Sequence, residues 1–427
     1  MKKEMNDAYI QILRQELIPA LGCTEPIAIA LAAAKARQVL GHFPESLEIH
    51  CSGSIIKNVK SVIIPNSGGL KGIEAAATLG MIGGDPNGDL EVLSKVTDQN
   101  RQQTQELLAA NFTTCKLQEN VDNLYVVAKV GFKEEFAEVT IINRHTLISK
   151  IVKNGKVLFQ QPNHLPSSKD AGGDSSLSVE TILEFANSVA IEDVKEVLDR
   201  QIKLNSEIAA CGLEHDYGTQ VGKTLLQNYG ANTPTRAKAV TAAASDARMG
   251  GCPKPVVINS GSGNQGLTVS LPVIEYARSL KVGQDKLYRA LCVSNLISIH
   301  LKRNIGSLSA FCGAVTAASG SGAAITYLHG GSYQQISNTI TNTIANIGGI
   351  VCDGAKPSCA AKVASSVDAA ILAHHMSMKG HTFLYGEGLV QNDIESTIKS
   401  IGYVGRVGMK NTDLEILHIM TNQISFC

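Results

Sequence analysis

Hydrophobic spacing divides the N-terminal part of the chain into helices and strands. Residues 5–19 and 26–40 predict helices, the second because its Ala-rich run IAIALAAAKARQVL contains no breaker. Residues 46–65 change character, since β-branched side chains and turn residues dominate, and they predict two strands. Three further elements are then expected: a helix over 70–82 behind a Gly-rich turn, a loop over 83–89 and a helix over 100–111.

Three later runs predict antiparallel strands: NLYVVAKVGF, EFAEVTIINR and HTLISKIVKNGKVLFQ. Asn154-Gly155 predicts a tight hairpin turn inside the third run, because both residue types tolerate positive φ. Residues 41–165 therefore predict a small α+β domain of mixed α/β structure, inserted after the N-terminal helices.

The remainder predicts a helical domain. The polar, Ser- and Gly-rich residues 163–177 predict a linker. After it, small residues dominate long stretches, which lets helices approach closely. We expect an α+β protein of three parts: residues 1–40 as helices that pack on the catalytic domain, 41–165 as the small α+β domain, and 178–427 as a larger, mostly α-helical catalytic domain.

Composition narrows the class of function. The 427 residues include 38 Lys+Arg and 38 Asp+Glu, a neutral balance that argues against nucleic acid or an anionic membrane as partner. No run of uncharged apolar residues is long enough to span a bilayer, and the charged N-terminus MKKEMNDAYIQILRQ lacks the apolar core of a secretion signal. We expect a cytoplasmic protein, in which the ten cysteines stay reduced.

The first candidate for chemistry is LGCTEPIAIA at 21–30. Thr24 is a good N-cap for the following helix and Pro26 suits its first turn, so Cys23 stands just before a helix N-terminus. The positive end of the helix dipole favours a thiolate there, and such a thiolate can act as a general base. The alternative is an ordinary buried cysteine that only packs.

Two Gly-rich turns form the second candidate. Gly261, Gly263 and Gly266 satisfy G-x-G-x-x-G, but helix follows helix afterwards and no second strand completes a dinucleotide-binding unit. Leu267 stands where a P-loop requires lysine. Such a turn can still bind a substrate carboxylate through backbone N–H groups. IPNSGGLKG at 64–72 has the same character, and for both turns the alternative is a purely structural bend.

The third candidate joins Cys312 with Cys352 and Cys359. No C-x-x-C pair occurs, so a zinc ribbon is a poor interpretation. Three cysteines could hold an iron–sulfur cluster with one iron left open as a Lewis acid, or they could be separate buried thiols. Cys427 ends the chain and could reach an open iron. Lys254 and Lys356 lack the surroundings of a pyridoxal phosphate lysine, so we expect no pyridoxal phosphate.

Taken together, these segments resemble a known family. LGCTEPIAIALAAA, IPNSGGLKG, SGSGNQG and Cys312 with CDGAKPSC look like the L-cysteine desulfidases, which are related to the α chain of iron–sulfur L-serine dehydratases. The resemblance implies an oxygen-sensitive 4Fe–4S cluster on Cys312, Cys352 and Cys359, and Cys23 as proton acceptor. We expect the substrate to contact side chains in or beside the motifs, namely Thr24, Glu25, Asn66, Ser260 and Asn264.

The resemblance also implies a reaction. Serine dehydratases of the group carry a Ser-Ser-His-Thr motif, which this chain lacks; Cys-Thr-Glu-Pro in its place favours cysteine over serine. We therefore expect a lyase of amino-acid catabolism that converts L-cysteine to pyruvate, ammonia and sulfide. L-Serine dehydration at the same cluster is the alternative, and a non-catalytic iron–sulfur or thiol sensor is a third. The sequence leaves homo-oligomerisation open.

Overall fold

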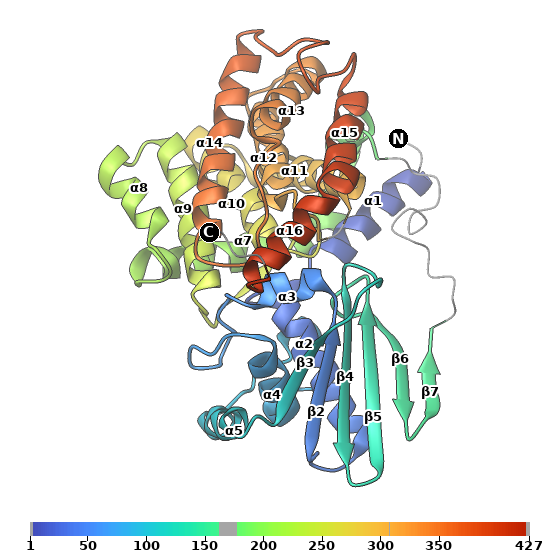
Figure 1. Cartoon of the computed structure of the whole chain (residues 1–427). Helices are drawn as coiled ribbons and strands as arrows, with labels where there is room; N and C mark the ends of the chain where they lie inside the picture. Colours follow the sequence, from blue (N-terminus) through green and yellow to red (C-terminus); the bar gives the residue numbers. More distant parts are fainter. Residues whose placement is uncertain (1–2, 162–176, 307, 424–427) are drawn as a thin grey trace.

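The chain folds into a sheet-containing part and a helical part that lie against each other (Figure 1). The computed structural model describes residues 3–161, 177–306 and 308–423. The predicted linker falls almost wholly outside these residues. The expected α+β class is confirmed, with the sheet in the N-terminal half and helices in the C-terminal half.

The sheet has six strands in the order β3-β2-β4-β5-β6-β7, and only β2 and β3 run parallel. Its strands are β2 (Ser46–Cys51), β3 (Thr113–Leu117), β4 (Tyr125–Phe132), β5 (Glu135–Ile142), β6 (Ile148–Lys153) and β7 (Lys156–Gln160). Strand β4 alternates buried and less buried positions, as expected of a sheet with one covered face. The predicted Asn154-Gly155 turn is confirmed, because both residues have positive φ and connect β6 to β7.

Helices cover one face of this sheet. They are α2 (Thr24–Leu40) and α4 (Ile73–Gly83), and α5 (Asp98–Ala109) packs on α4 (Figure 1). Ile27, Ile29 and Leu31 of α2 join Val126 and Val139 of the sheet in one hydrophobic core. Tyr9 and Leu13 of α1 (Lys3–Glu16) lie in the core of the helical part, and the core that contains α2 also includes Val240 and Leu271 of the helical part. The division of the chain into three parts stays a prediction.

Of the two strands predicted over 46–65, the first is present and the second is not. Residues 46–51 form β2, but the following segment is the short helix α3 (Gly53–Val59). Ser52 caps this helix, because its hydroxyl accepts a hydrogen bond from the N–H of Ile55 at 3.4 Å. Ile55 and Val59 are fully buried, so tertiary packing outweighs the strand preference of β-branched side chains.

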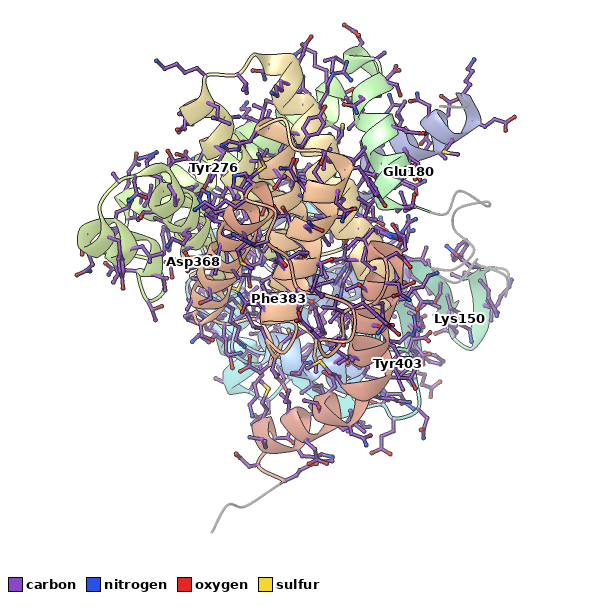
Figure 2. All side chains as sticks on the ribbon, turned by 90° about the horizontal axis from the view of Figure 1, so that it is seen from above. Lys150, Glu180, Tyr276, Asp368, Phe383 and Tyr403 are labelled. Carbon is purple, nitrogen blue, oxygen red and sulfur yellow. The ribbon has the colours of Figure 1, made fainter. Side chains whose placement is uncertain are left out.

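The helical part wraps a second core. Its elements are α6 (Val179–Ser188), α7 (Ile191–Glu214), α8 (Val221–Tyr229), α9 (Thr233–Met249), α10 (Gly263–Leu280), α11 (Gln284–Ile305), α12 (Gly313–Leu328), α13 (Tyr333–Ile347), α14 (Cys359–Met378), α15 (Ile394–Tyr403) and α16 (Lys410–Met420). Among the described residues, none of the helices has the length and hydropathy required to cross a membrane. Seen from above, Lys150 of β6 and Tyr276 of α10 lie toward opposite sides of the molecule (Figure 2).

Two features join the parts. The short strands β1 (Pro19–Leu21) and β8 (Pro255–Val257) pair antiparallel, which brings the start of α2 beside the Gly-rich turn before α10. Helix α3 lies at the boundary beneath α16 (Figure 1), and Ser54 of α3 donates a hydrogen bond of 3.1 Å to Asp413 of α16. These contacts hold the start of α2, the Gly-rich turn before α10 and helix α3 at the boundary between the two parts, which is called the junction below.

Candidate active site

The three cysteines from two distant segments are brought together by a short backbone pairing. Phe311 and Val351 form an antiparallel bridge. Beside it, the N–H of Cys312 donates to Ile350 at 3.0 Å and the N–H of Cys352 donates to Ala310 at 2.6 Å. Cys312 is the residue before α12 and Cys359 is the first residue of α14, so both thiols stand at helix N-termini.

Burial and mutual proximity make two of the three thiols, Cys312 and Cys359, costly to ionise. Burial, and then the neighbouring Cys352 thiol, raise the pKa of Cys312 to about 12. Burial and Cys352 also raise the pKa of Cys359. Each thiol thus lies within electrostatic range of another, and all three are free. Thiolates crowded in this way are stabilised when positive charge binds among them.

Lysines supply part of that positive charge. Lys362 donates a 2.7 Å hydrogen bond to the carbonyl of Val351 and forms an ion pair with Asp353. Its pKa is raised, because the attraction of Asp353 and then of the Cys312 and Cys352 thiols outweighs the burial that opposes the charge. For Lys302 of α11, burial is the stronger effect and lowers the pKa, although Cys352 and Cys312 act in the opposite direction. The lysines beside the three cysteines therefore favour an anionic group there.

Cys23 lies at the same junction. It is the N-cap residue of α2 and is 2% exposed. The prediction that Thr24 caps this helix is wrong, because Thr24 is the first helical residue and its hydroxyl donates to Glu25 and Gly261 instead. Cys23 forms a small buried cluster with Val62 and Met249, and Cys359 packs against that cluster together with Ala355. The predicted base and one predicted cluster ligand therefore belong to the same small hydrophobic cluster, although 336 positions separate them in the chain (359 − 23).

Glu25 changes the expected character of this thiol. The Sγ–H of Cys23 donates to Glu25 Oε2 at 2.9 Å. Burial, and then the Glu25 carboxylate, raise the pKa of Cys23 well above its ordinary value, and Arg248 opposes this only in part. The expected lowering of the Cys23 pKa is thus wrong, because burial and the adjacent carboxylate outweigh the helix dipole.

Glu25 itself stays ionised. Burial alone would raise its pKa, but the neighbouring His145 imidazole, and then the hydrogen bond from the Cys23 thiol, lower it to about 2. Asn58 Nδ2 donates to Glu25 Oε1 at 3.3 Å, and Thr24 Oγ1 donates to Oε2 at 3.2 Å. The start of α2 therefore carries a fixed negative charge beside a neutral thiol.

The Gly-rich turn before α10 borders both groups. Thr24 Oγ1 donates to the carbonyl of Gly261 at 2.9 Å. A Cβ on Gly313 would stand 2.6 Å from the side chain of Gln265, so the starts of α10 and α12 are in close contact. Ser260 adopts φ +50° and donates to Asn259, and Asn264 accepts from Ser245 at 3.2 Å. The antiparallel β8 before this turn agrees with the rejection of a dinucleotide-binding unit.

The second turn contributes packing at this junction. A Cβ on Gly22 would stand 2.3 Å from Pro65 Cγ, so this turn lies against the residue before Cys23. Asn66, however, directs its amide to the carbonyl of Leu93 at 2.9 Å. A substrate contact by Asn66 therefore stays a prediction, as do those of Ser260 and Asn264.

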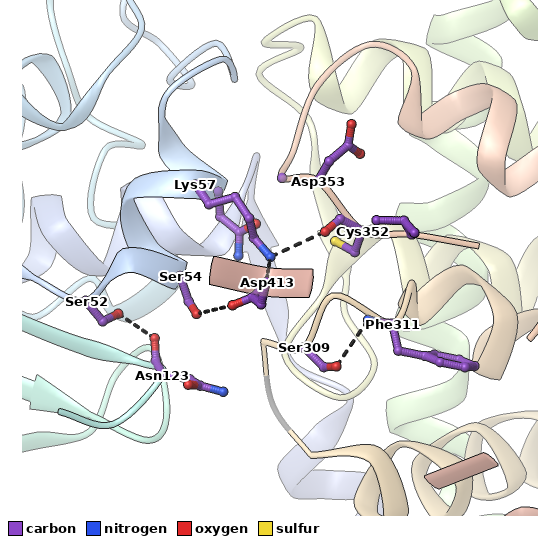
Figure 3. A network of polar contacts seen from close by, with 12 residues as sticks. Ser52, Ser54, Lys57, Asn123, Ser309, Phe311, Cys352, Asp353 and Asp413 are labelled. Atoms are coloured by element: carbon purple, nitrogen blue, oxygen red, sulfur yellow. Dashed lines mark hydrogen bonds and ion pairs between the residues drawn. The ribbon is translucent and has the colours of Figure 1, made fainter. Parts of the chain in front are cut away.

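Sequence reasoning missed the charged groups around the motifs. Lys57 of α3 is 2% exposed, forms an ion pair with Asp413 and donates to the carbonyl of Cys352 at 3.3 Å (Figure 3). Arg248 is buried at the end of α9 and donates to the carbonyl of Gly22 at 3.0 Å. Lysines and arginines in otherwise ordinary helices carry no local signal, so only the fold could reveal them.

The donor set fits a cluster better than a single ion. Among the described residues, no three His, Cys, Asp or Glu side chains are arranged to hold one metal ion. In an iron–sulfur cluster each cysteine binds a different iron, so three neighbouring free thiols amid lysines meet the requirement without converging on a point. Cys427, the predicted ligand of the open iron, lies outside the described residues.

Relatives of this chain share its whole length. A protein of Lachnoclostridium phytofermentans named UPF0597 protein is 53% identical over 98% of this chain and 100% of its own. UPF0597 proteins of Desulfitobacterium hafniense and Treponema denticola are 52% and 46% identical, each over 98% of this chain and over 97% and 99% of their own lengths. Residues 87–418 match the family described as serine dehydratase alpha chain. The chain therefore belongs to the serine dehydratase alpha chain family.

Proposed function

We propose that this chain is an iron–sulfur lyase that eliminates the β-substituent of L-cysteine and yields pyruvate, ammonia and sulfide. One observation carries the proposal: Cys312, Cys352 and Cys359 are neighbours, and Cys359 packs against the cluster that contains Cys23. The expected cytoplasmic location and small-molecule substrate belong to the same proposal.

Cys312, Cys352 and Cys359 would hold the 4Fe–4S cluster. When bound, the cluster supplies a Lewis acid at the iron that no cysteine holds. Lys302 and Lys362 offset the negative charge of the thiolates, and burial keeps bulk water from weakening that attraction. The residues of this chain perform the remaining tasks of binding, orientation and proton transfer.

Two opposite charges would orient the amino acid. The Glu25 carboxylate, ionised because its pKa is about 2, suits the α-ammonium group of the substrate. Free backbone N–H groups at the start of α10 and the ammonium of Lys302 suit the substrate carboxylate. An L-amino acid held by both groups presents its Cα proton and its β-substituent in fixed directions.

Cys23 would accept the Cα proton. Its raised pKa makes the thiolate scarce but strongly basic, which suits a weakly acidic C–H bond. The substrate ammonium beside Glu25 offsets the carboxylate charge that disfavours this thiolate. As the Cα–H and Cβ–S bonds break, the Cα=Cβ bond forms and sulfide leaves. The resulting aminoacrylate tautomerises to the imine, which water hydrolyses to pyruvate and ammonia.

L-Serine dehydratase is the second candidate, and the match to the serine dehydratase alpha chain family favours it. The same groups would act, with the β-hydroxyl leaving as water. The Cys23-Thr24-Glu25-Pro26 sequence, in place of the Ser-Ser-His-Thr motif, is the feature that favours cysteine.

A matched pair of variants tests the assignment. Anaerobically reconstituted protein is assayed for pyruvate, ammonia and sulfide from cysteine, and for pyruvate and ammonia from serine. Cys23→Ser should lose turnover while keeping the brown cluster chromophore, whereas Cys115→Ser, on strand β3, should retain both. Full turnover in Cys23→Ser would refute the role of the base, and turnover of serine alone would favour the second candidate.

A further inference from the structure

His145 occupies an unusual position for a side chain of the small sheet domain. It lies in the connection between β5 and β6 and is 9% exposed. A Cβ added to Gly261 would stand 3.3 Å from Cε1 of His145, so the imidazole lies against the Gly-rich turn of the helical part. Nε2 is buried and, among the described residues, has no hydrogen-bond partner. A buried polar atom without a partner is costly, which indicates a purpose beyond packing.

The atom that Nε2 faces is Glu25 Oε1, at 3.8 Å. Glu25 uses its other oxygen, Oε2, to accept the Sγ–H of Cys23 at 2.9 Å. The carboxylate therefore stands between the thiol and the imidazole. The distance of 3.8 Å is slightly beyond a hydrogen bond, so a small movement of the β5–β6 connection suffices to form one.

We propose that His145 is a positioning residue that donates an N–H to Glu25 Oε1 and so fixes the carboxylate against the Cys23 thiol. Through this contact the β5–β6 connection contributes to a site whose other groups come from α2, α3 and the helical part. The kinetic consequence rests on the proposed lyase function, but the contact itself does not.

Other charged groups near this pair remain unchanged when His145 is replaced. Arg248 acts on Cys23, and Lys302 lies within electrostatic range of Glu25. Asn58 still donates to Glu25 Oε1. An electrostatic effect specific to His145 must therefore pass through its own contact with Glu25, whereas an effect of its packing against Gly261 depends on volume alone.

Two replacements separate hydrogen bonding from space filling. His145→Leu keeps volume but removes the donor, and His145→Gln keeps an amide donor. If His145 acts by donation, His145→Leu should lower kcat/KM about tenfold or more, the usual scale for a hydrogen bond to a charged group, and His145→Gln should restore part of it. If it only fills space, Leu should serve at least as well as Gln. His50→Gln, on β2, is the control and should retain full activity.

A second readout does not depend on lyase activity. The rate at which iodoacetamide alkylates Cys23 in the reconstituted protein is followed by peptide mass spectrometry. His145→Leu should slow alkylation about threefold or more, because a carboxylate without its donor opposes the thiolate more strongly. Glu25→Gln should accelerate it, and His145→Leu should have no further effect in the Glu25→Gln background.

Failure of the proposed role of His145 can be distinguished from failure of the proposed lyase function. An equal effect of His145→Leu in both backgrounds, or none in either, would overturn the proposal. Absence of turnover in the wild type would remove the lyase function, while the alkylation rates would still decide the role of His145. If His145→Leu lowers the unfolding temperature markedly, His145→Phe, which keeps a ring but has no donor, replaces it in the same comparison.

Discussion

Removal of the Asp413 charge should destabilise the junction between the two parts of the molecule. Lys57 is 2% exposed and its ion pair with Asp413 is the charged contact between α3 and α16 (Figure 3). Asp413→Asn keeps the shape and an acceptor for Ser54 but leaves a buried ammonium without its counter-ion. Breaking a buried pair in this way typically costs about 3–5 kcal/mol. An unfolding entropy of about 2.1 cal/mol/K per residue amounts to roughly 0.9 kcal/mol/K for the 427 residues, so the unfolding temperature should fall by about 3–6 °C.

The control is an exposed pair of the same chemistry. Lys95, 77% exposed, contacts Asp85 at 2.9 Å, so Asp85→Asn should change stability by under about 1 kcal/mol. Thermal unfolding of both variants, followed by circular dichroism, gives the comparison. The double variant Lys57→Met/Asp413→Leu should recover most of the loss, because it removes both charges together. Equal unfolding temperatures for Asp413→Asn and Asp85→Asn would refute the reasoning.

Two further predictions concern the helical part. Burial raises the pKa of Asp246 to about 6 from 3.8, so the wild type should lose about 3 kcal/mol of stability as pH rises from 4 to above 6. Asp246→Asn cannot titrate and should lack this loss, which urea unfolding at several pH values would reveal; parallel pH profiles would contradict it. A Cβ on Gly266 would stand 2.0 Å from the carbonyl oxygen of Val257, so Gly266→Ala should lower the unfolding temperature by several degrees. A Cβ on Gly349 would meet no atom of the described residues within 4 Å, so Gly349→Ala should leave the unfolding temperature unchanged. Similar unfolding temperatures for the two glycine variants would contradict that packing argument.

Much of the fold follows from local patterns. The alternation along β4 and the positive-φ pair Asn154-Gly155 fix the sheet meander, because both signals act between near neighbours. Helix α3 escaped prediction because its β-branched side chains favour a strand when considered alone. Burial of Ile55 between the two parts decides otherwise, and that contact is visible only in three dimensions.

The candidate site likewise contains residues that the sequence could predict and residues that only the fold reveals. Cys23 and the three cysteines at 312, 352 and 359 stand in recognisable motifs, and the fold brings them to one junction. The state of the Cys23 thiol could not be inferred, because the effect of Glu25 depends on a burial that the sequence does not reveal. Lys57 and His145 come from segments without a motif, and only tertiary packing places them at the site.

The central claim is that Cys312, Cys352 and Cys359 together hold a cluster that serves a β-elimination. Its most direct test is anaerobic reconstitution of the wild type and of Cys312→Ala, with iron and sulfide content, visible absorbance and product analysis on cysteine measured on the same samples. The account predicts about four irons per chain, a brown chromophore and equal amounts of pyruvate and sulfide for the wild type, all lost in Cys312→Ala. Undiminished iron content and turnover in Cys312→Ala would contradict it.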